Sequence, residues 1–149
     1  MIKSLKEKEC KRILSQNYIG HLGYIYQDKP FVIPITYFYK ENQIICYSGE
    51  GHKIQALRKQ SNVALEVSEI ESSNHWQSAI VHGFYQELEG SNAKAQLHEF
   101  SLGVKDVIMR KELRDLDFIS EFSARINTND LPIVFVININ EITGKMRRN

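Results

Sequence analysis

One short segment of the sequence combines a hydroxyl, two glycines and a cation: Ser48-Gly49-Glu50-Gly51-His52-Lys53. It stands between a strand-like run and a helix-like run, so the glycines allow backbone N–H groups to turn toward an anion at the positive end of the helix dipole. Lys53 adds a full positive charge and Ser48 a hydroxyl donor. The segment predicts an anion-binding loop; the alternative is a flexible turn with a solvated lysine.

A second feature is a proline in the middle of a strand-like run, Phe31-Val32-Ile33-Pro34-Ile35-Thr36-Tyr37. Pro34 has no N–H to donate to a ladder, so it marks a sheet edge or a bulge. Its neighbours Ile35 and Thr36 offer an apolar wall and a polar group to a flat ligand. The alternative is an edge-strand proline that only discourages aggregation.

The third feature is Trp76-Gln77-Ser78, an amphipathic aromatic side chain beside an amide and a hydroxyl. Such a group can border a ligand, although a single tryptophan is more often part of a core or an interface. One face of the strand that begins here carries Ile80, His82, Phe84 and Leu88.

The elements that must position these residues alternate between two patterns. Runs rich in β-branched and aromatic residues predict six strands, at residues 18–26, 31–39, 43–48, 63–67, 76–88 and 133–140. Apolar residues at helical spacing predict helices at residues 4–15, 52–60, 91–102 and 113–126, the first opened by a capping box of Ser4 and Glu7. Strands joined mostly by tight turns indicate a mainly β fold, an antiparallel barrel with added helices.

Composition limits the class of protein. With 149 residues, 42% of them hydrophobic, the chain is expected to form a single domain over residues 1–149. Its 19 basic and 18 acidic residues nearly cancel, which gives no reason to expect a nucleic-acid or membrane partner. The charged start lacks the apolar run of a secretory signal, so we expect a soluble cytoplasmic protein. Cys10 and Cys46 are expected to be packing residues.

The histidines do not indicate a metal site. None of His21, His52, His75, His82 and His98 falls into a His-x-x-x-His pattern, and scattered strand histidines are usually structural. No metal is therefore expected. His52 differs because it lies in the predicted loop, where it could hydrogen-bond an anion or face a substrate; an exposed histidine at a helix start is an equally plain interpretation.

The order and spacing of the three segments resemble the pyridoxamine 5′-phosphate oxidase-like family of split barrels, and most closely its nitroimidazole-resistance, or nitroimidazole reductase-like, branch. The resemblance runs from about Gly20 to Gly83 and returns at residues 142–145. It implies a six-stranded antiparallel FMN-binding split barrel. It also implies a homodimer with two flavin sites at the subunit interface, holding FMN, with FAD as an alternative.

The same resemblance implies roles for individual residues. Pro34, Ile35 and Thr36 would line the flavin ring. Ser48, Gly51, His52 and Lys53 would approach its phosphate. Trp76, Gln77 and Ser78 would border the cofactor from the partner subunit or from the same one. His52 is the single candidate for a catalytic residue.

The implied activity is that of an FMN-dependent oxidoreductase acting on a small aromatic molecule such as a nitroimidazole. The alternatives are a flavin-binding module without turnover and a haem-binding split barrel. The chain ends at Gly144-Lys145-Met146-Arg147-Arg148-Asn149 and lacks the arginine-containing C-terminal segment with which authentic pyridoxamine phosphate oxidases hold their substrate. This departure argues against oxidation of vitamin B6.

Overall fold

The computed structural model describes residues 1–112 and 132–149, which form eight strands and three helices. In chain order these elements are β1 (Ile2–Ser4), α1 (Glu7–Ser15), β2 (Ile19–Tyr26), β3 (Lys29–Thr36), β4 (Phe38–Lys40), β5 (Gln43–Ser48), α2 (His52–Lys59), β6 (Asn62–Ser72), β7 (His75–Glu87), α3 (Gly90–Glu112) and β8 (Ile133–Arg148). All the ladders are antiparallel, and the strands form one sheet. The predicted mainly β architecture is confirmed, with eight strands in place of six.

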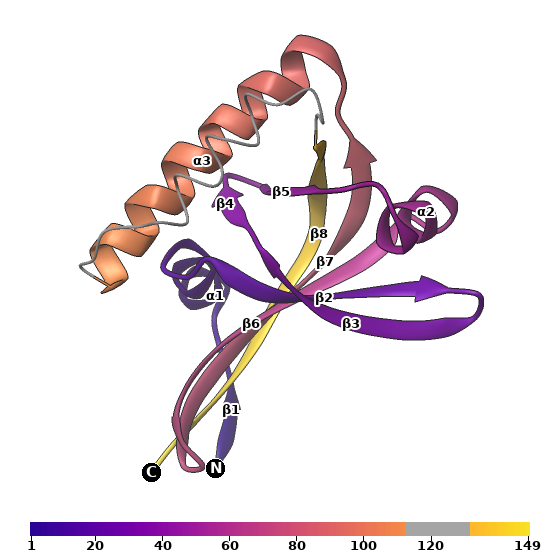
Figure 1. The fold of residues 1–149 in the computed structure, drawn as a ribbon. Helices are drawn as coiled ribbons and strands as arrows, with labels where there is room; N and C mark the ends of the chain where they lie inside the picture. The colour runs from indigo at the N-terminus through magenta and orange to yellow at the C-terminus, as the bar shows by residue number, and fades with distance from the viewer. Residues whose placement is uncertain (113–131) are drawn as a thin grey trace.

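The two edges of this sheet are joined by a single residue. The strand order is β3-β2-β6-β7-β8-β5-β4, and β1 pairs with β8. β3 and β4 are therefore the edges, yet only Tyr37 separates them in the chain. The sheet must curl until its edges meet. We call the junction at Tyr37 the seam of the split barrel: there the chain passes directly from β3 to β4, as Figure 1 shows, and within the described residues the two strands share no ladder.

Tyr37 holds the seam together. Its side chain is fully buried, its N–H donates to the Tyr18 carbonyl at 2.9 Å, and its hydroxyl donates to the Leu14 carbonyl at 2.8 Å. Leu14 belongs to α1, so one side chain ties the barrel edges to the first helix. Burial raises the pKa of Tyr37 above its ordinary range, and the hydroxyl stays protonated as a donor.

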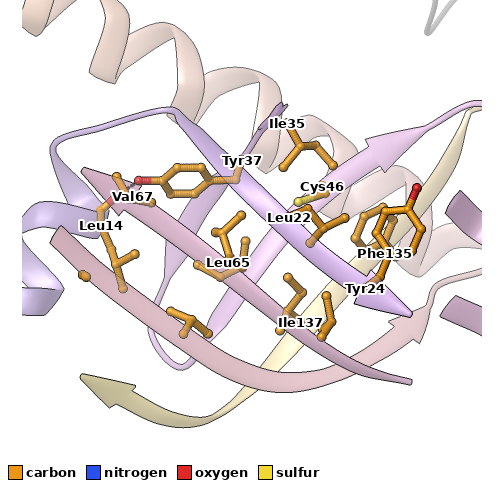
Figure 2. Packing of buried hydrophobic residues seen from close by; sticks show 14 of the residues in the cluster. Leu14, Leu22, Tyr24, Ile35, Tyr37, Cys46, Leu65, Val67, Phe135 and Ile137 are labelled. Atoms are coloured by element: carbon orange, nitrogen blue, oxygen red, sulfur yellow. Dashed lines mark hydrogen bonds between the residues drawn. The ribbon is translucent and has the colours of Figure 1, made fainter. Parts of the chain in front are cut away.

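Two apolar clusters fill the molecule. The first lies inside the barrel and consists of inward-facing strand residues with contributions from α1 and α2 (Figure 2); it includes Leu14, Leu22, Ile35, Cys46, Leu65, Val67, Phe135 and Ile137. The second lies between α3 and the outer side of β5 and β8; it includes Ile45, Phe100, Val104, Ile108, Val134 and Val136. The first part of β8 is thus buried on both faces, which explains its unbroken apolar sequence.

The N-terminus departs from the prediction. Residues 2–4 form β1, in which Ser4 pairs with Lys145 of β8 and accepts a hydrogen bond from its ammonium group at 2.9 Å. The predicted capping box of Ser4 and Glu7 is wrong because Ser4 is committed to this ladder. The helix begins later, and the Lys6 N–H donates to Glu9 Oε1 at 3.4 Å.

Several other boundaries also differ. The strand predicted at residues 31–39 is divided at Tyr37 into β3 and β4, and the strands predicted at 63–67 and 133–140 extend to Ser72 and Arg148. The helix predicted at 91–102 runs on to Glu112. The helix predicted at 113–126 lies outside the described residues. The apolar central part of each strand has a clear strand pattern in the sequence. The polar extensions of β6 and β8 have no such pattern, because they are stabilised by pairing with β1 and within the β6–β7–β8 ladder.

Among the residues that the structure describes, no helix has the length and apolar character needed to cross a membrane. Within the same residues, no group of three or more histidine, cysteine or acidic side chains is arranged to hold a metal ion.

Candidate functional site

The predicted anion-binding loop joins β5 to α2, and the backbone N–H groups at the start of α2 are accessible to a ligand. Ser48 ends β5, and the N-cap of α2 is Gly51, which has no side chain to cap the helix. The first turn of α2 contains no acidic residue. A Cβ atom built on Gly49 or Gly51 would meet nothing within 4 Å. The start of α2 therefore has no side-chain cap from Gly51, and the space around the two glycines is open to a ligand.

Lys53 supplies the cation of this loop. Its side chain is half-buried, and no carboxylate in the described part of the chain forms an ion pair with it. Burial lowers the pKa of Lys53, although the neighbouring Cys46 acts in the opposite direction. A half-buried ammonium group without an acidic partner is costly, and an anion bound in the loop would compensate for that cost.

Cys46 itself is not a reactive thiol. It is fully buried in β5, two residues before the loop, and burial raises its pKa far above the ordinary value. Cys10 is also buried and free, so both cysteines are packing residues, as predicted.

His52 anchors the start of α2 to the β2–β3 hairpin. The Tyr24 hydroxyl lies 3.2 Å from His52 Nδ1, and the ring centroids of Tyr26 and Phe31 lie 4.0 and 4.9 Å from that of His52. Sequence reasoning did not identify these aromatic neighbours. Nδ1 is engaged by Tyr24, so Nε2 is the ring nitrogen that remains for a ligand.

The two other polar groups of the loop are already committed. The Ser48 hydroxyl donates to the Gly49 carbonyl at 3.0 Å. The Glu50 carboxylate accepts from Arg58 Nη1 at 2.5 Å. Arg58 also forms a two-pronged bridge to Glu87, with Nε–Oε1 at 2.8 Å and Nη2–Oε2 at 3.0 Å. No local pattern in the sequence predicts this bridge, which attaches α2 to the end of β7.

The residues predicted around Pro34 lie on an edge strand, but they do not share a face. Among the described residues β3 pairs with β2 alone, and on such an edge strand a proline whose nitrogen points away from β2 costs no ladder bond. Pro34 is exposed and Thr36 is half-buried. Ile35 is 8% exposed and belongs to the barrel interior, as Figure 2 shows. Only the backbone of Ile35 is available to a ligand outside the barrel.

The Trp76-Gln77-Ser78 segment lies at the opposite end of β7 from the loop. Glu87, which binds Arg58 of α2, is nine residues beyond Ser78, a separation of roughly 30 Å in an extended strand. In Figure 1 the start of β7 lies near both termini, whereas α2 lies beside the far ends of β2 and β3. One chain therefore does not bring these two predicted groups into one site.

Gln77 also points away from its two neighbours. Its amide donates to Glu69 Oε1 at 2.6 Å, and the Asn17 amide donates to the other oxygen at 2.8 Å. Burial opposes ionisation of Glu69, but these donors outweigh it and hold the pKa of the carboxyl below its ordinary value. Gln77 is thus part of a polar network with Glu69 and with Asn17, which follows α1, while Trp76 and Ser78 face the other side of the sheet.

That other side is a continuous outer surface of the sheet. One row across it places Pro34, His21, Glu66 and Ile80 on adjacent strands. Beside it lies an apolar groove of about 420 Å³, whose walls include Phe31, Val32, Ala64 and His82. Val32 is 69% exposed and Phe84 is 43% exposed. The face predicted to carry Ile80, His82 and Phe84 is the outward one.

Comparison with known proteins identifies the family. A model of the pyridoxamine 5′-phosphate oxidase family matches residues 6–146. The chain belongs to this family. An uncharacterized protein of Rhizobium meliloti is 26% identical over 146 residues, covering 97% of this chain and 94% of its own.

Solved structures of the same fold include three informative neighbours. A FAD-binding protein from Mesorhizobium loti has a TM-score of 0.77 at 23% identity, with 100% of this chain and 98% of the other covered. A FAD-binding protein from Mycobacterium smegmatis has a TM-score of 0.63 at 17% identity, with 98% of each chain covered. A candidate 5-nitroimidazole antibiotic resistance protein from Bacteroides thetaiotaomicron has a TM-score of 0.65 at 20% identity, with 98% and 89% covered. These likenesses establish the fold.

Proposed function

We propose that this chain binds a flavin through its phosphate at residues 48–53 and acts as a flavin-dependent oxidoreductase. The observation that carries the proposal is the uncapped start of α2 beside Lys53, a half-buried cation that forms no ion pair within the described residues. An anion with several oxygens, such as a phosphate, matches this donor set. Membership of a family that contains flavin-binding relatives favours a flavin over other phosphates.

The residues of the loop would divide the work of binding. The N–H groups of the first turn of α2 and the Lys53 ammonium would hold the phosphate, while the Tyr24–His52 contact keeps that turn against the barrel. Pro34 and Thr36 would border the flavin ring with side chains, and Ile35 with its backbone. A bound flavin would supply hydride transfer, the chemistry that the chain's own side chains lack.

A homodimer would complete the site. Trp76 and Ser78 are too far from the loop of their own chain to share a ligand with it, but a second copy could bring them close. The outer groove and its exposed apolar residues Val32 and Phe84 are suited to burial against another chain. We therefore propose two sites per dimer, each built from both chains.

The proposed substrate is a small aromatic molecule such as a nitroimidazole, which would stack on the flavin ring. Reduction of its nitro group by one hydride and one proton would release one oxygen as water. Reduced nicotinamide is the proposed donor. FMN is the proposed cofactor form and FAD the alternative; FAD-binding relatives support the flavin but not the choice between the two. The predicted cytoplasmic location stays a prediction.

The test begins with the purified protein. We expect a yellow protein whose released cofactor is a flavin with a terminal phosphate, and an absorbance spectrum that bleaches on anaerobic addition of reduced nicotinamide. Lys53→Ala should lose the cofactor with the fold retained, whereas the control Lys59→Ala, at the end of the same helix, should keep it. A colourless protein that rejects both FMN and FAD would exclude the proposal. If the protein binds flavin but the flavin reacts with no electron donor, the proposal of an oxidoreductase would be replaced by that of a flavin-binding module.

A further inference from the structure

Glu50 is an unexpected residue in a loop that binds an anion. It lies between the two glycines, immediately before the N-cap of α2. A carboxylate at that position is attracted by the same N–H groups and helix dipole that would hold a phosphate. Left free, it would either occupy the donors itself or repel the phosphate. Something in the chain must prevent both.

Arg58 directs the Glu50 carboxylate elsewhere. Nη1 of Arg58 lies 2.5 Å from Glu50 Oε1, a contact between residues eight positions apart. Arg58 is the penultimate residue of α2, about two turns beyond its first residue. The Glu50 side chain therefore points toward the C-terminal end of α2, away from the N–H donors, and its charge is paired with that of Arg58.

Arg58 is itself fixed from the other side. Glu87 accepts its Nε and Nη2 groups at 2.8 and 3.0 Å, a fork that restricts the guanidinium in direction as well as position. The Tyr85 hydroxyl donates to the same Glu87 at 2.7 Å. Tyr85 in turn packs on the buried Phe135. A continuous series of contacts therefore links the barrel core, through Tyr85, Glu87 and Arg58, to Glu50 in the loop. The guanidinium cannot simply follow Glu50 back toward the start of the helix.

We propose that Arg58 is a positioning residue of the phosphate loop, which holds Glu50 away from the N–H donors and cancels its charge so that a phosphate can bind. The inference rests on the proposed function. It adds that the Glu50 carboxylate competes with the phosphate for the N–H donors and has to be held away from them. It makes Arg58 necessary for the phosphate of a flavin and not for its ring.

Four proteins test this proposal, each titrated with FMN and with riboflavin, which lacks the phosphate. Relative to wild type, Arg58→Ala should bind FMN about three- to tenfold more weakly at low salt, because a free carboxylate then opposes the phosphate. Its affinity for riboflavin should change by less than about twofold. Glu50→Gln should bind FMN more tightly than wild type. Arg58→Ala combined with Glu50→Gln should regain the FMN affinity that Arg58→Ala loses.

The double variant separates positioning from a merely structural role. If Arg58 only anchors α2 to β7, the double variant stays as weak as Arg58→Ala, riboflavin weakens equally and added salt leaves the deficit unchanged; any of these results overturns the proposal. Because the side chains of Glu50 and Arg58 are 54% and 40% exposed, salt should instead diminish the deficit. Arg110→Ala, which breaks the exposed Arg110–Asp106 pair on α3, is the control for losing a surface arginine.

The outcomes also separate this inference from the proposed function. If wild type binds neither flavin, both fall together. If wild type binds FMN and Arg58→Ala binds it equally well, only the role of Arg58 is lost. Should Arg58→Ala fail to fold by circular dichroism, Glu50→Gln decides: weaker FMN binding in that variant would overturn the proposal, because Glu50 could then not be a competitor.

Discussion

The hydroxyl of Tyr24 lies 3.2 Å from Nδ1 of His52, and this contact fixes the first residue of α2 to the second strand of the barrel. Tyr24 is 5% exposed, so its position is set by the core, whereas His52 lies at the surface. The Tyr24–His52 contact thus holds the start of α2, and with it the loop that precedes α2, in a fixed position against the barrel. Burial raises the pKa of Tyr24, which keeps its hydroxyl protonated.

Tyr24→Phe removes this hydrogen bond but leaves the ring in the core. We expect FMN to bind about three- to tenfold more weakly, the usual consequence of losing one such bond, because the start of α2 is less well held. Tyr26→Phe is the matched control: the Tyr26 ring packs edge-to-face with His52, and within the described residues its hydroxyl makes no hydrogen bond to His52. Fluorescence titration measures both. If Tyr24→Phe binds FMN as tightly as Tyr26→Phe, the hydrogen bond of Tyr24 is not what holds His52.

Lys53→Met should have opposite effects on binding and on stability. FMN affinity should fall roughly 10- to 100-fold, because one charged hydrogen bond to the phosphate is lost. The cofactor-free protein should instead melt at a higher temperature, since burial of the ammonium group lowers its pKa and makes the charged form costly in the folded state.

The pH dependence follows from the sign of this shift. Because the folded pKa of Lys53 lies below its ordinary value of 10.5, the unfolded chain binds more protons between the two values. Wild-type stability therefore rises with pH through that window relative to Lys53→Met. The melting advantage of the variant should be largest near neutral pH and should shrink toward pH 10.5. An advantage that grows with pH would contradict the assigned cause.

Local patterns in the sequence were sufficient to predict part of this site. The edge position of Pro34 follows from its missing N–H, and the loop before α2 follows from two glycines and a lysine between a strand and a helix. Both features depend on residues close together in the chain. Alternation along β3 should also have separated Ile35 from Pro34, since neighbouring strand residues face opposite sides.

The partners of the loop could not be predicted in this way. Arg58 and Glu87 are 29 residues apart, and their bridge depends on the place where β7 ends beside α2. Likewise, Ser4 matched a capping box as well as a strand, and only its pairing with Lys145 decides between the two. Both the Arg58–Glu87 bridge and the place of Ser4 in a strand depend on how the strands pair across the whole sheet. A single sequence does not reveal that register.

Tyr37→Phe tests the seam of the barrel. The variant loses the hydrogen bond to Leu14 and leaves a buried carbonyl oxygen without that donor, so we expect the free energy of unfolding to fall by about 1–2 kcal/mol. Tyr39→Phe, in β4 and partly exposed, is the control and should change stability by less than about 0.5 kcal/mol. Urea unfolding followed by circular dichroism measures the difference. Equal stability of the two variants would show that the seam does not depend on this hydroxyl.

Val32→Asp tests whether the outer groove is the dimer interface. Val32 is 69% exposed in the single chain, so a carboxylate there should not disturb folding, but it would be buried against a partner. We expect the variant to elute as a monomer in size-exclusion chromatography with light scattering and to lose its flavin. Leu102→Asp places the same charge on α3, where Leu102 is 55% exposed, and should leave the mass of the wild-type protein unchanged. A dimeric Val32→Asp protein would place the interface elsewhere.

A mixing experiment tests whether Lys53 and Trp76 act across that interface. Lys53→Met and Trp76→Ala should each bind flavin poorly alone, because every site in either homodimer lacks one of the two residues. In a mixed dimer, one site combines Lys53 of one chain with Trp76 of the other and is intact. Unfolding and refolding an equal mixture should restore about one quarter of the sites, since half the dimers are mixed and each has one intact site of two. If both residues act within a single chain, mixing restores none.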